Sequence, residues 1–247
     1  MTALLTIILS FIGALVCGLM PSSAHRRIRW VALAFAAAGL GVSAACCVNY
    51  SGGEFADLLE AEWIPSLGIG FTTGYDGISL PLLLVTGLVA VCGVLFSWTL
   101  ESRANQFYAF YFALIGGVYG VFLSLDLFLL FVFYEIAVVP KYFLIAIWGG
   151  VRRQFAAMKL VLYSFGGSAL VLLGMLAVFF LANDASGESL KTFSLLALQE
   201  GQVPAEAQQW IFPMIFVGFA IMAGMWPFHT WAPTGHVAAP TAVSMLL

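Results

Sequence analysis

The sequence predicts an all-α membrane protein, a bundle of helices that crosses the bilayer several times. Of its 247 residues, 62% are hydrophobic and only 9% are charged, whereas about 25% of the residues in a soluble domain are charged. Its mean hydropathy is +1.03. The apolar residues gather in runs long enough to cross about 30 Å of hydrocarbon, which takes about 20 helical residues. We therefore expect one membrane domain made of spans and short connections.

Seven apolar runs of this length follow one another along the chain. One helix over residues 107–149 would be about 64 Å long, twice the hydrocarbon thickness, so we expect a turn near Asp126 to divide it. A further run begins at Val237, and the residues from there to Leu247 cover about 16 Å, which is the start of an eighth span. The seven predicted spans are 2–20, 30–48, 78–98, 107–125, 127–149, 156–182 and 210–225.

The first run could be mistaken for a secretory signal peptide, because Ser22 and Ala24 offer a small-residue cleavage pattern. A signal peptide carries its basic residues before the apolar run, and here they follow it. We therefore expect residues 1–20 to remain as the first span.

Basic residues lie in alternate loops, which predicts the orientation of the chain. The loops after the first, third and fifth runs are basic, and those after the second and sixth are acidic apart from Lys191. Lys and Arg favour the cytoplasmic side, so we expect the N-terminus outside. The two acidic outer loops are long enough for short surface helices. The basic residues are Arg26, Arg27, Arg29, Arg103, Arg152 and Arg153, and the acidic ones are Glu54, Asp57, Glu60, Glu62, Asp184, Glu188, Glu200 and Glu206.

Glu135 is a carboxylate in the middle of the fifth run. A charged group at that depth costs about 2.5–3.5 kcal/mol on insertion scales, so an acid there usually marks an ion or proton path. The alternative is a structural glutamate that stays protonated or pairs with a neighbouring helix. We expect Glu135 to carry protons.

Lys141 lies in the same run, directly after Pro140. It is six residues from Glu135 and therefore about 120° away around the helix, so the two do not form an i, i+4 pair. Because Lys141 is nearer the cytoplasmic end, we expect it to snorkel toward that surface, with a place on a polar path as the alternative.

Lys159 lies in the first turns of the sixth run, and Tyr163, four residues later, shares its helix face. Lys159 is either an anchor at the inner surface or part of a polar path. Tyr163 would be an auxiliary residue of that path.

Residues 224–240 contain three prolines, Pro227, Pro233 and Pro240, and cannot form one regular helix. Apolar segments flank this stretch, and broken backbone at membrane depth is tolerated only where protein buries it or water reaches it. His229 and His236 lie within it, and histidines can pass protons near neutral pH. The alternatives are an interfacial loop anchored by tryptophans, or histidines bonded to backbone carbonyls.

The sequence gives no sign of a cofactor or a metal on this chain. The four cysteines lie in apolar runs without C-x-x-C spacing, so we expect them to be small buried hydrophobic residues. No glycine-rich phosphate loop stands between a strand and a helix. Haem is disfavoured because its two histidines would lie on facing helices. Nothing points to a nucleic-acid partner.

Four segments resemble one known family. Residues 131–150, with Glu135 and Pro140, resemble the fifth span of the antiporter-like M subunit of bacterial respiratory complex I, the chain 4 homologue. Residues 152–168 fit the start of its sixth span, 227–244 its broken seventh helix and the following loop, and 76–84 its third span. The likeness runs from about residue 70 to the end of the chain.

The resemblance implies a membrane-arm subunit in the bacterial inner membrane that takes part in proton translocation coupled to quinone reduction. Residues 1–106 would form an N-terminal three-helix segment, and 107–247 the first of two inverted antiporter-like repeats, truncated in its last helix. NADH, FMN, iron–sulfur clusters and quinone would be bound by partner subunits. Glu135 would be the family's intramembrane glutamate, with Lys159, His229 and His236 as further proton-transfer residues.

Two departures from the family are expected to matter. The family's partner lysine precedes the Pro-Phe-His motif by five residues, and here that position is Met222, which cannot titrate. The chain also stops before the second repeat, so we expect a partner chain to supply the missing C-terminal half, beside other membrane-arm subunits and the lipid bilayer. The alternatives are a non-translocating structural or truncated remnant, or a component of a multisubunit cation/proton antiporter.

Overall fold

The computed structural model describes residues 2–53, 55–184 and 187–247, so Glu54 of the acidic loop lies outside the described residues. The elements in chain order are α1 (Leu4–Leu19), α2 (His25–Asn49), β1 (Ala56–Ile64), η1 (Pro65–Leu67), β2 (Ile69–Tyr75), α3 (Ser79–Phe96), α4 (Ala104–Leu123), α5 (Leu127–Trp148), α6 (Arg153–Leu181), α7 (Leu195–Glu200), α8 (Ala205–Met222), α9 (Trp231–Ala238) and α10 (Thr241–Ser244).

Six of the described helices are long and apolar enough to cross a membrane: α2, α3, α4, α5, α6 and α8. Helix α1 is also apolar but shorter, with 16 residues. Each of these seven helices begins and ends within a few residues of a predicted run, because the apolar residues are what distinguishes spans from connections. The chain is a multi-pass, mostly helical membrane protein.

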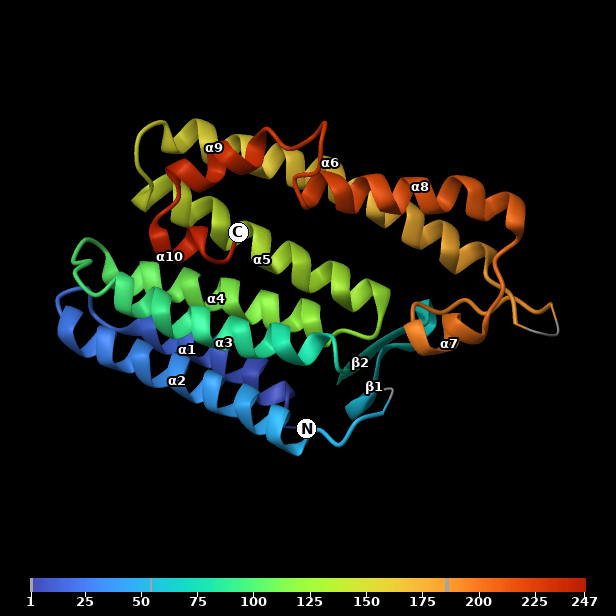
Figure 1. The fold of residues 1–247 in the computed structure, drawn as a ribbon, viewed down its shortest axis with the longest axis horizontal. Helices are drawn as coiled ribbons and strands as arrows, with labels where there is room; N and C mark the ends of the chain where they lie inside the picture. The colour runs from blue at the N-terminus through green and yellow to red at the C-terminus, as the bar shows by residue number, and fades with distance from the viewer. Residues whose placement is uncertain (1, 54, 185–186) are drawn as a thin grey trace.

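The helices pack in chain order except around α4, which lies at the centre of the bundle. Figure 1 shows α1 to α4 side by side, α5 next to α4, and α6 with α8 beyond α5. The strands and α7 lie together at one end, which we call the hairpin end. The opposite end, the arginine end, holds the turns that carry Arg26, Arg27, Arg103, Arg152 and Arg153.

Helix α4 is held at the centre by hydrogen bonds and close backbone packing. Tyr111 is fully buried and its hydroxyl donates to the Val89 carbonyl of α3 at 3.0 Å. On the other side, a Cβ on Gly117 would lie only 2.9 Å from the backbone nitrogen of Ala137, so a glycine lets α5 approach closely. This contact fixes the rotation of α5, which carries Glu135.

The predicted all-α fold is wrong at the hairpin end. The loop after α2 forms an antiparallel hairpin of β1 and β2, with Leu59 opposite Thr73 and Glu60 opposite Thr72, where we expected a surface helix. A 3₁₀ turn joins the strands and ends at Gly68, whose φ of +62° is the left-handed conformation that glycine favours. In the other acidic loop, α7 is a short helix of six residues.

The hairpin forms because distant backbone groups complete it. The Leu125 amide in the α4–α5 turn donates to the Thr72 carbonyl of β2, and the Leu127 amide donates to the Phe193 carbonyl, both at 2.9 Å. An extended turn is thus held between the hairpin and the segment before α7. These pairings join residues far apart in sequence, which local patterns do not reveal.

Candidate functional site

Glu135 lies near the middle of α5, about 12 Å from its first residue and about 20 Å from its last at 1.5 Å per residue. Its Oε1 atom is buried and has no hydrogen-bond partner among the described residues. A buried polar atom without a partner costs free energy, so its presence calls for an explanation such as a functional role or an unseen water.

The packing of α5 on α4 decides where Glu135 points. Phe133 and Ala137 face the glycines of α4. Glu135 is two residues from each, about 200° away around the helix, so it faces away from α4. Next to it on the α5 surface, an apolar cavity of about 230 Å³ lies between α5 and α6. Its lining residues are Val138, Val139, Tyr142, Met158, Val161 and Phe165.

Lys141 does not reach toward the nearer end of its helix, so the expectation that it snorkels is wrong. Its Nζ atom lies over the ring of Tyr134, 5.9 Å from the centroid, and Tyr134 is two turns toward the start of α5. A cation at this distance from an aromatic face is attracted by the ring quadrupole. Helical side chains lean toward the N-terminus of their helix, which takes the Lys141 ammonium deeper into the span.

Lys159 and Tyr163 both bind the connection between α8 and α9. The Lys159 ammonium donates to the Thr230 carbonyl at 2.7 Å and lies 3.5 Å from the Thr234 hydroxyl. The Tyr163 hydroxyl lies 2.9 Å from the Thr230 hydroxyl. Lys159 and Tyr163 therefore lie on the same face of α6, as predicted, because both bind Thr230. These contacts form a small polar cluster of two α6 side chains and two threonines.

The two histidines lie outside that cluster. His229 is exposed in the connection, one residue before Thr230. His236 is exposed on α9, and its Nδ1 atom lies 2.9 Å from the Ser244 hydroxyl of α10. No described hydrogen bond links either histidine to Glu135.

The prolines of this stretch have three different positions. Helix α8 ends at Met222, and Gly224, with φ +69°, follows in a cap where the Met225 amide donates to the Ala220 carbonyl. Pro227 lies in the non-helical connection, and Pro240 lies between α9 and α10. Pro233, expected to break the backbone, instead lies in the first turn of α9, where the missing N–H costs nothing.

Met222 is the last residue of α8. It is 9% exposed and packs with Val171 and Met175 of α6 in a buried apolar cluster, against which Tyr134 also packs. The chain therefore places a thioether, and no charge, where α8 meets the α5–α6 interface. No described hydrogen bond crosses this cluster from Lys159 to Glu135.

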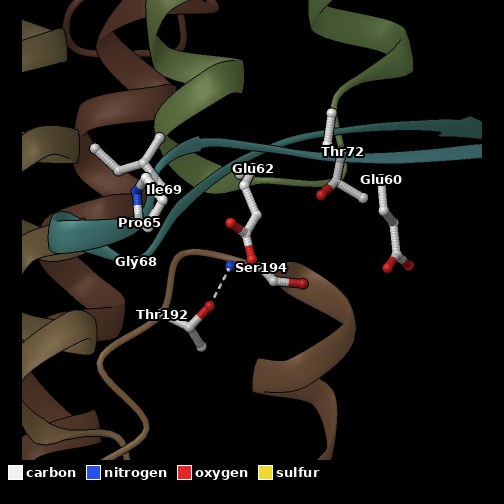
Figure 2. Close-up of a pocket in the computed structure, with 10 residues that line it drawn as sticks. Glu60, Glu62, Pro65, Gly68, Ile69, Thr72, Thr192 and Ser194 are labelled. Atoms are coloured by element: carbon white, nitrogen blue, oxygen red, sulfur yellow. Dashed lines mark hydrogen bonds between the residues drawn. The ribbon is translucent and has the colours of Figure 1, made fainter.

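The hairpin end holds a polar cavity that sequence patterns did not predict. It has a volume of about 500 Å³ and lies between the hairpin and the segment before α7. Figure 2 shows the Glu62 side chain extending from the hairpin toward Ser194, whose amide donates to the Thr192 hydroxyl at 3.1 Å. The cavity is near the start of α5, and none of its lining residues belongs to α5.

Asp126 is the N-cap of α5, a structural role that the sequence patterns above did not bring out. Its Oδ1 accepts from the amides of Phe128 and Leu129, and its Oδ2 accepts from the Gly70 amide at 3.3 Å. Burial raises the pKa of Asp126 above its ordinary value, although these amides oppose the shift. An aspartate directly before an apolar run is a helix N-cap signal that would have located it.

The residues present give no metal centre: within the described ranges, no group of three or more His, Cys, Asp or Glu side chains could hold a metal ion. What the chain offers instead is an acid at mid-span, a lysine on the same helix whose ammonium lies over the Tyr134 ring, and a polar cluster at the α8–α9 connection.

Comparison with known proteins assigns this architecture. Residues 124–247 match the model of the family described as "NADH:quinone oxidoreductase/Mrp antiporter, TM". The chain belongs to this family. The match includes α5 with Glu135, α6 with Lys159, and the connection from α8 to α10.

Members and structural neighbours cover almost the whole chain. A NAD(P)H-quinone oxidoreductase chain 4 from Picosynechococcus is 35% identical over 247 residues, which is 98% of this chain and 44% of that protein. A chain of respiratory complex I from Thermus thermophilus superposes with a TM-score of 0.85 at 25% identity, over 99% of this chain and 49% of that one. The Mrp complex from Dietzia gives a TM-score of 0.77 at 21% identity, with 100% and 26% covered. The chain spans less than half the length of the curated relatives it matches.

Proposed function

We propose that this chain is a membrane-arm subunit of a complex I-like NADH:quinone oxidoreductase and takes part in proton translocation coupled to quinone reduction. The observation that carries the proposal is Glu135, a mid-span carboxylate with one buried oxygen that has no partner among the described residues. Such a group is expensive at membrane depth, and one that is retained there usually marks an ion or proton path. Membership of the family, and similarity to chain 4 proteins of quinone oxidoreductases, support the same role.

In this proposal the chain crosses the membrane seven times. Helix α1, about 24 Å long at 1.5 Å per residue, is the short first span. Helices α8 and α9 are two parts of one broken span, interrupted over 223–230, and α10 belongs to the next. Residues 1–106 are the N-terminal three-helix segment, and 107–247 are a first antiporter-like repeat. Lys159 and Tyr163 of α6 both bind Thr230 in the interruption, which supports a broken span that packs on α6.

The hairpin end faces outward in this proposal, and the membrane is the bacterial inner membrane. The arginines gather at the opposite end, as the positive-inside rule requires, so the N-terminus lies outside. Other membrane-arm subunits are the partners. NADH, FMN, iron–sulfur clusters and quinone belong to partner subunits.

Protons would enter or leave Glu135 through groups that lead to the arginine end. The polar cluster of Lys159, Tyr163 and Thr230 would hold ordered water beside the α8–α9 connection. Exposed His229 and His236 would pass protons between this cluster and solvent.

The test is the substitution Glu135→Gln, which keeps the shape and removes the titratable group. It is introduced into the chromosomal gene, so that the chain assembles with its natural partners. In inverted membrane vesicles, proton uptake per quinone reduced should fall about tenfold or more, because a proton-transfer group has been removed. Glu200→Gln, an exposed glutamate of α7 at the hairpin end, is the matched control.

Vesicles that assemble the complex and keep the wild-type ratio of protons to quinone with Glu135→Gln would refute the assigned role. The amount of assembled complex is measured on native gels in the same preparations, so that a loss of assembly is not read as a loss of transport.

A further inference from the structure

Lys141 and Lys159 begin at similar depths but end in different environments. Lys141 is seven residues before the end of α5, and Lys159 is six residues after the start of α6, so each Cα lies about 10 Å from the arginine end of its helix. Their helices are antiparallel and joined by the short turn at 149–152.

Backbone direction sends the two side chains apart. Cα–Cβ bonds tilt toward the N-terminus of a helix. In α5 that direction leads toward mid-span, and the Lys141 ammonium lies over the Tyr134 ring, 5.9 Å from its centroid. In α6 it leads back toward the arginine end, and the Lys159 ammonium donates to Thr230 in the exposed connection. Of the two, only Lys141 carries its charge deeper into the membrane.

The head of Lys141 therefore lies beside Tyr134, the residue that directly precedes Glu135 in α5. Tyr134 also packs against the buried cluster that contains Met222. The acid and the ammonium lie on adjacent faces of α5, and no ion pair within 4.0 Å joins them among the described residues.

We propose that Lys141 is the mid-membrane cation that works with Glu135, in place of a lysine on α8, where this chain has Met222. The inference rests on the proposed function. A cation held over the ring of Tyr134, the neighbour of Glu135 in α5, stabilises the ionised carboxylate more when it approaches and less when it withdraws. Movement of the flexible lysine stem around Tyr134 thus couples the protonation of the two groups. Lys141 acts through Glu135 and is a positioning residue for its charge.

The test compares Lys141→Met with the exchanged double variant Lys141→Met/Met222→Lys in the assembled complex. Lys141→Met should lower proton uptake per quinone reduced about tenfold, because the cation that stabilises the ionised form of Glu135 is lost. The exchange should restore a large part of it, because lysine at 222 brings a cation to the same apolar cluster from α8. Lys141→Arg should keep part of the activity. Lys191→Met, in the connection before α7, is the matched control.

The results separate this inference from the proposed function. If Glu135→Gln abolishes pumping but Lys141→Met leaves it unchanged, the inference is wrong and the proposed function stands. If neither changes pumping, the proposed function fails. If Lys141→Met loses proton uptake that the double variant does not recover, and Lys141→Arg is equally inactive, Lys141 has a structural role and the inference is overturned. Where Lys141→Met does not assemble, Lys141→Gln replaces it, and normal pumping by that variant overturns the inference.

Discussion

Asp76 and Asp126 each accept hydrogen bonds from the first amides of a helix, but their surroundings shift their pKa values in opposite directions. Bonds from the Ser79 and Ile78 amides lower the pKa of Asp76 before α3. At the start of α5, burial outweighs similar bonds and raises the pKa of Asp126. The same type of side chain, close to the start of a helix in both cases, therefore contributes to stability in different pH ranges.

We predict opposite pH dependences for Asp126→Asn and Asp76→Asn. Folded Asp126 holds its proton more tightly than the unfolded chain does, so its contribution to stability is present below about pH 3.8 and is lost as pH rises. Asp76 contributes above that pH and loses its contribution as pH falls. Asp126→Asn also loses the Gly70 bond, which costs about 1 kcal/mol, or about 2–4 °C in melting temperature.

The measurement is the melting temperature of each protein in lipid nanodiscs between pH 3.5 and 7. The gap between wild type and Asp126→Asn should be widest at the acidic end, and that between wild type and Asp76→Asn should be widest at neutral pH. The opposite pKa shifts would be contradicted if these differences in melting temperature did not change with pH, or if both changed in the same direction.

At the scale of elements, the contact between α4 and α5 decides how Glu135 is presented. Gly117 brings the two backbones together, and the rotation it fixes turns Glu135 away from α4 and toward α6. The helices themselves follow from the apolar runs, which is why their limits were predictable. The rotation of each about its axis depends on which small residue meets which backbone.

Gly117→Leu should therefore destabilise the bundle. The new side chain would meet the Ala137 backbone, which cannot move aside as a flexible side chain would, and overpacking of this kind costs about 1–3 kcal/mol. Gly166→Leu on α6 is the matched control, since a Cβ there meets nothing within 4 Å. The measurement is the yield and melting temperature of the purified protein. Equal values for the two variants would show that α4 and α5 tolerate separation.

At the scale of the whole molecule, the two ends of the bundle differ in charge and in structure. The arginine end has short turns, whereas the hairpin end carries a small sheet, α7 and a cavity of about 500 Å³ with two glutamates on its wall. Basic charge sets the orientation during insertion, so this asymmetry predicts which end remains in the cytoplasm.

Labelling of single introduced cysteines tests that orientation. Ser66→Cys lies in the exposed turn of the hairpin, and Ser102→Cys lies in the exposed turn between α3 and α4. In intact spheroplasts, a membrane-impermeant maleimide should label the Ser66→Cys protein and spare the Ser102→Cys protein. Inverted vesicles should give the reverse. The parent protein, with its four native cysteines, gives the background labelling. Labelling of the Ser102→Cys protein alone in spheroplasts would show that the orientation is the opposite of the one predicted.

Hydrophobic run length and local motifs are properties of contiguous residues, so the membrane class, the limits of the apolar helices, the family and the position of Glu135 could all be predicted from the sequence. The hairpin, the contact of Lys141 with Tyr134 and the common target of Lys159 and Tyr163 became visible in the folded chain alone. Each of these depends on partners distant in the chain or on the direction in which a helix runs across the bilayer. Residue spacing encodes neither the distant partners nor the direction of the helix. Lys141 and Lys159 therefore start at similar depths, but the Lys141 side chain points toward mid-span and the Lys159 side chain binds the exposed connection.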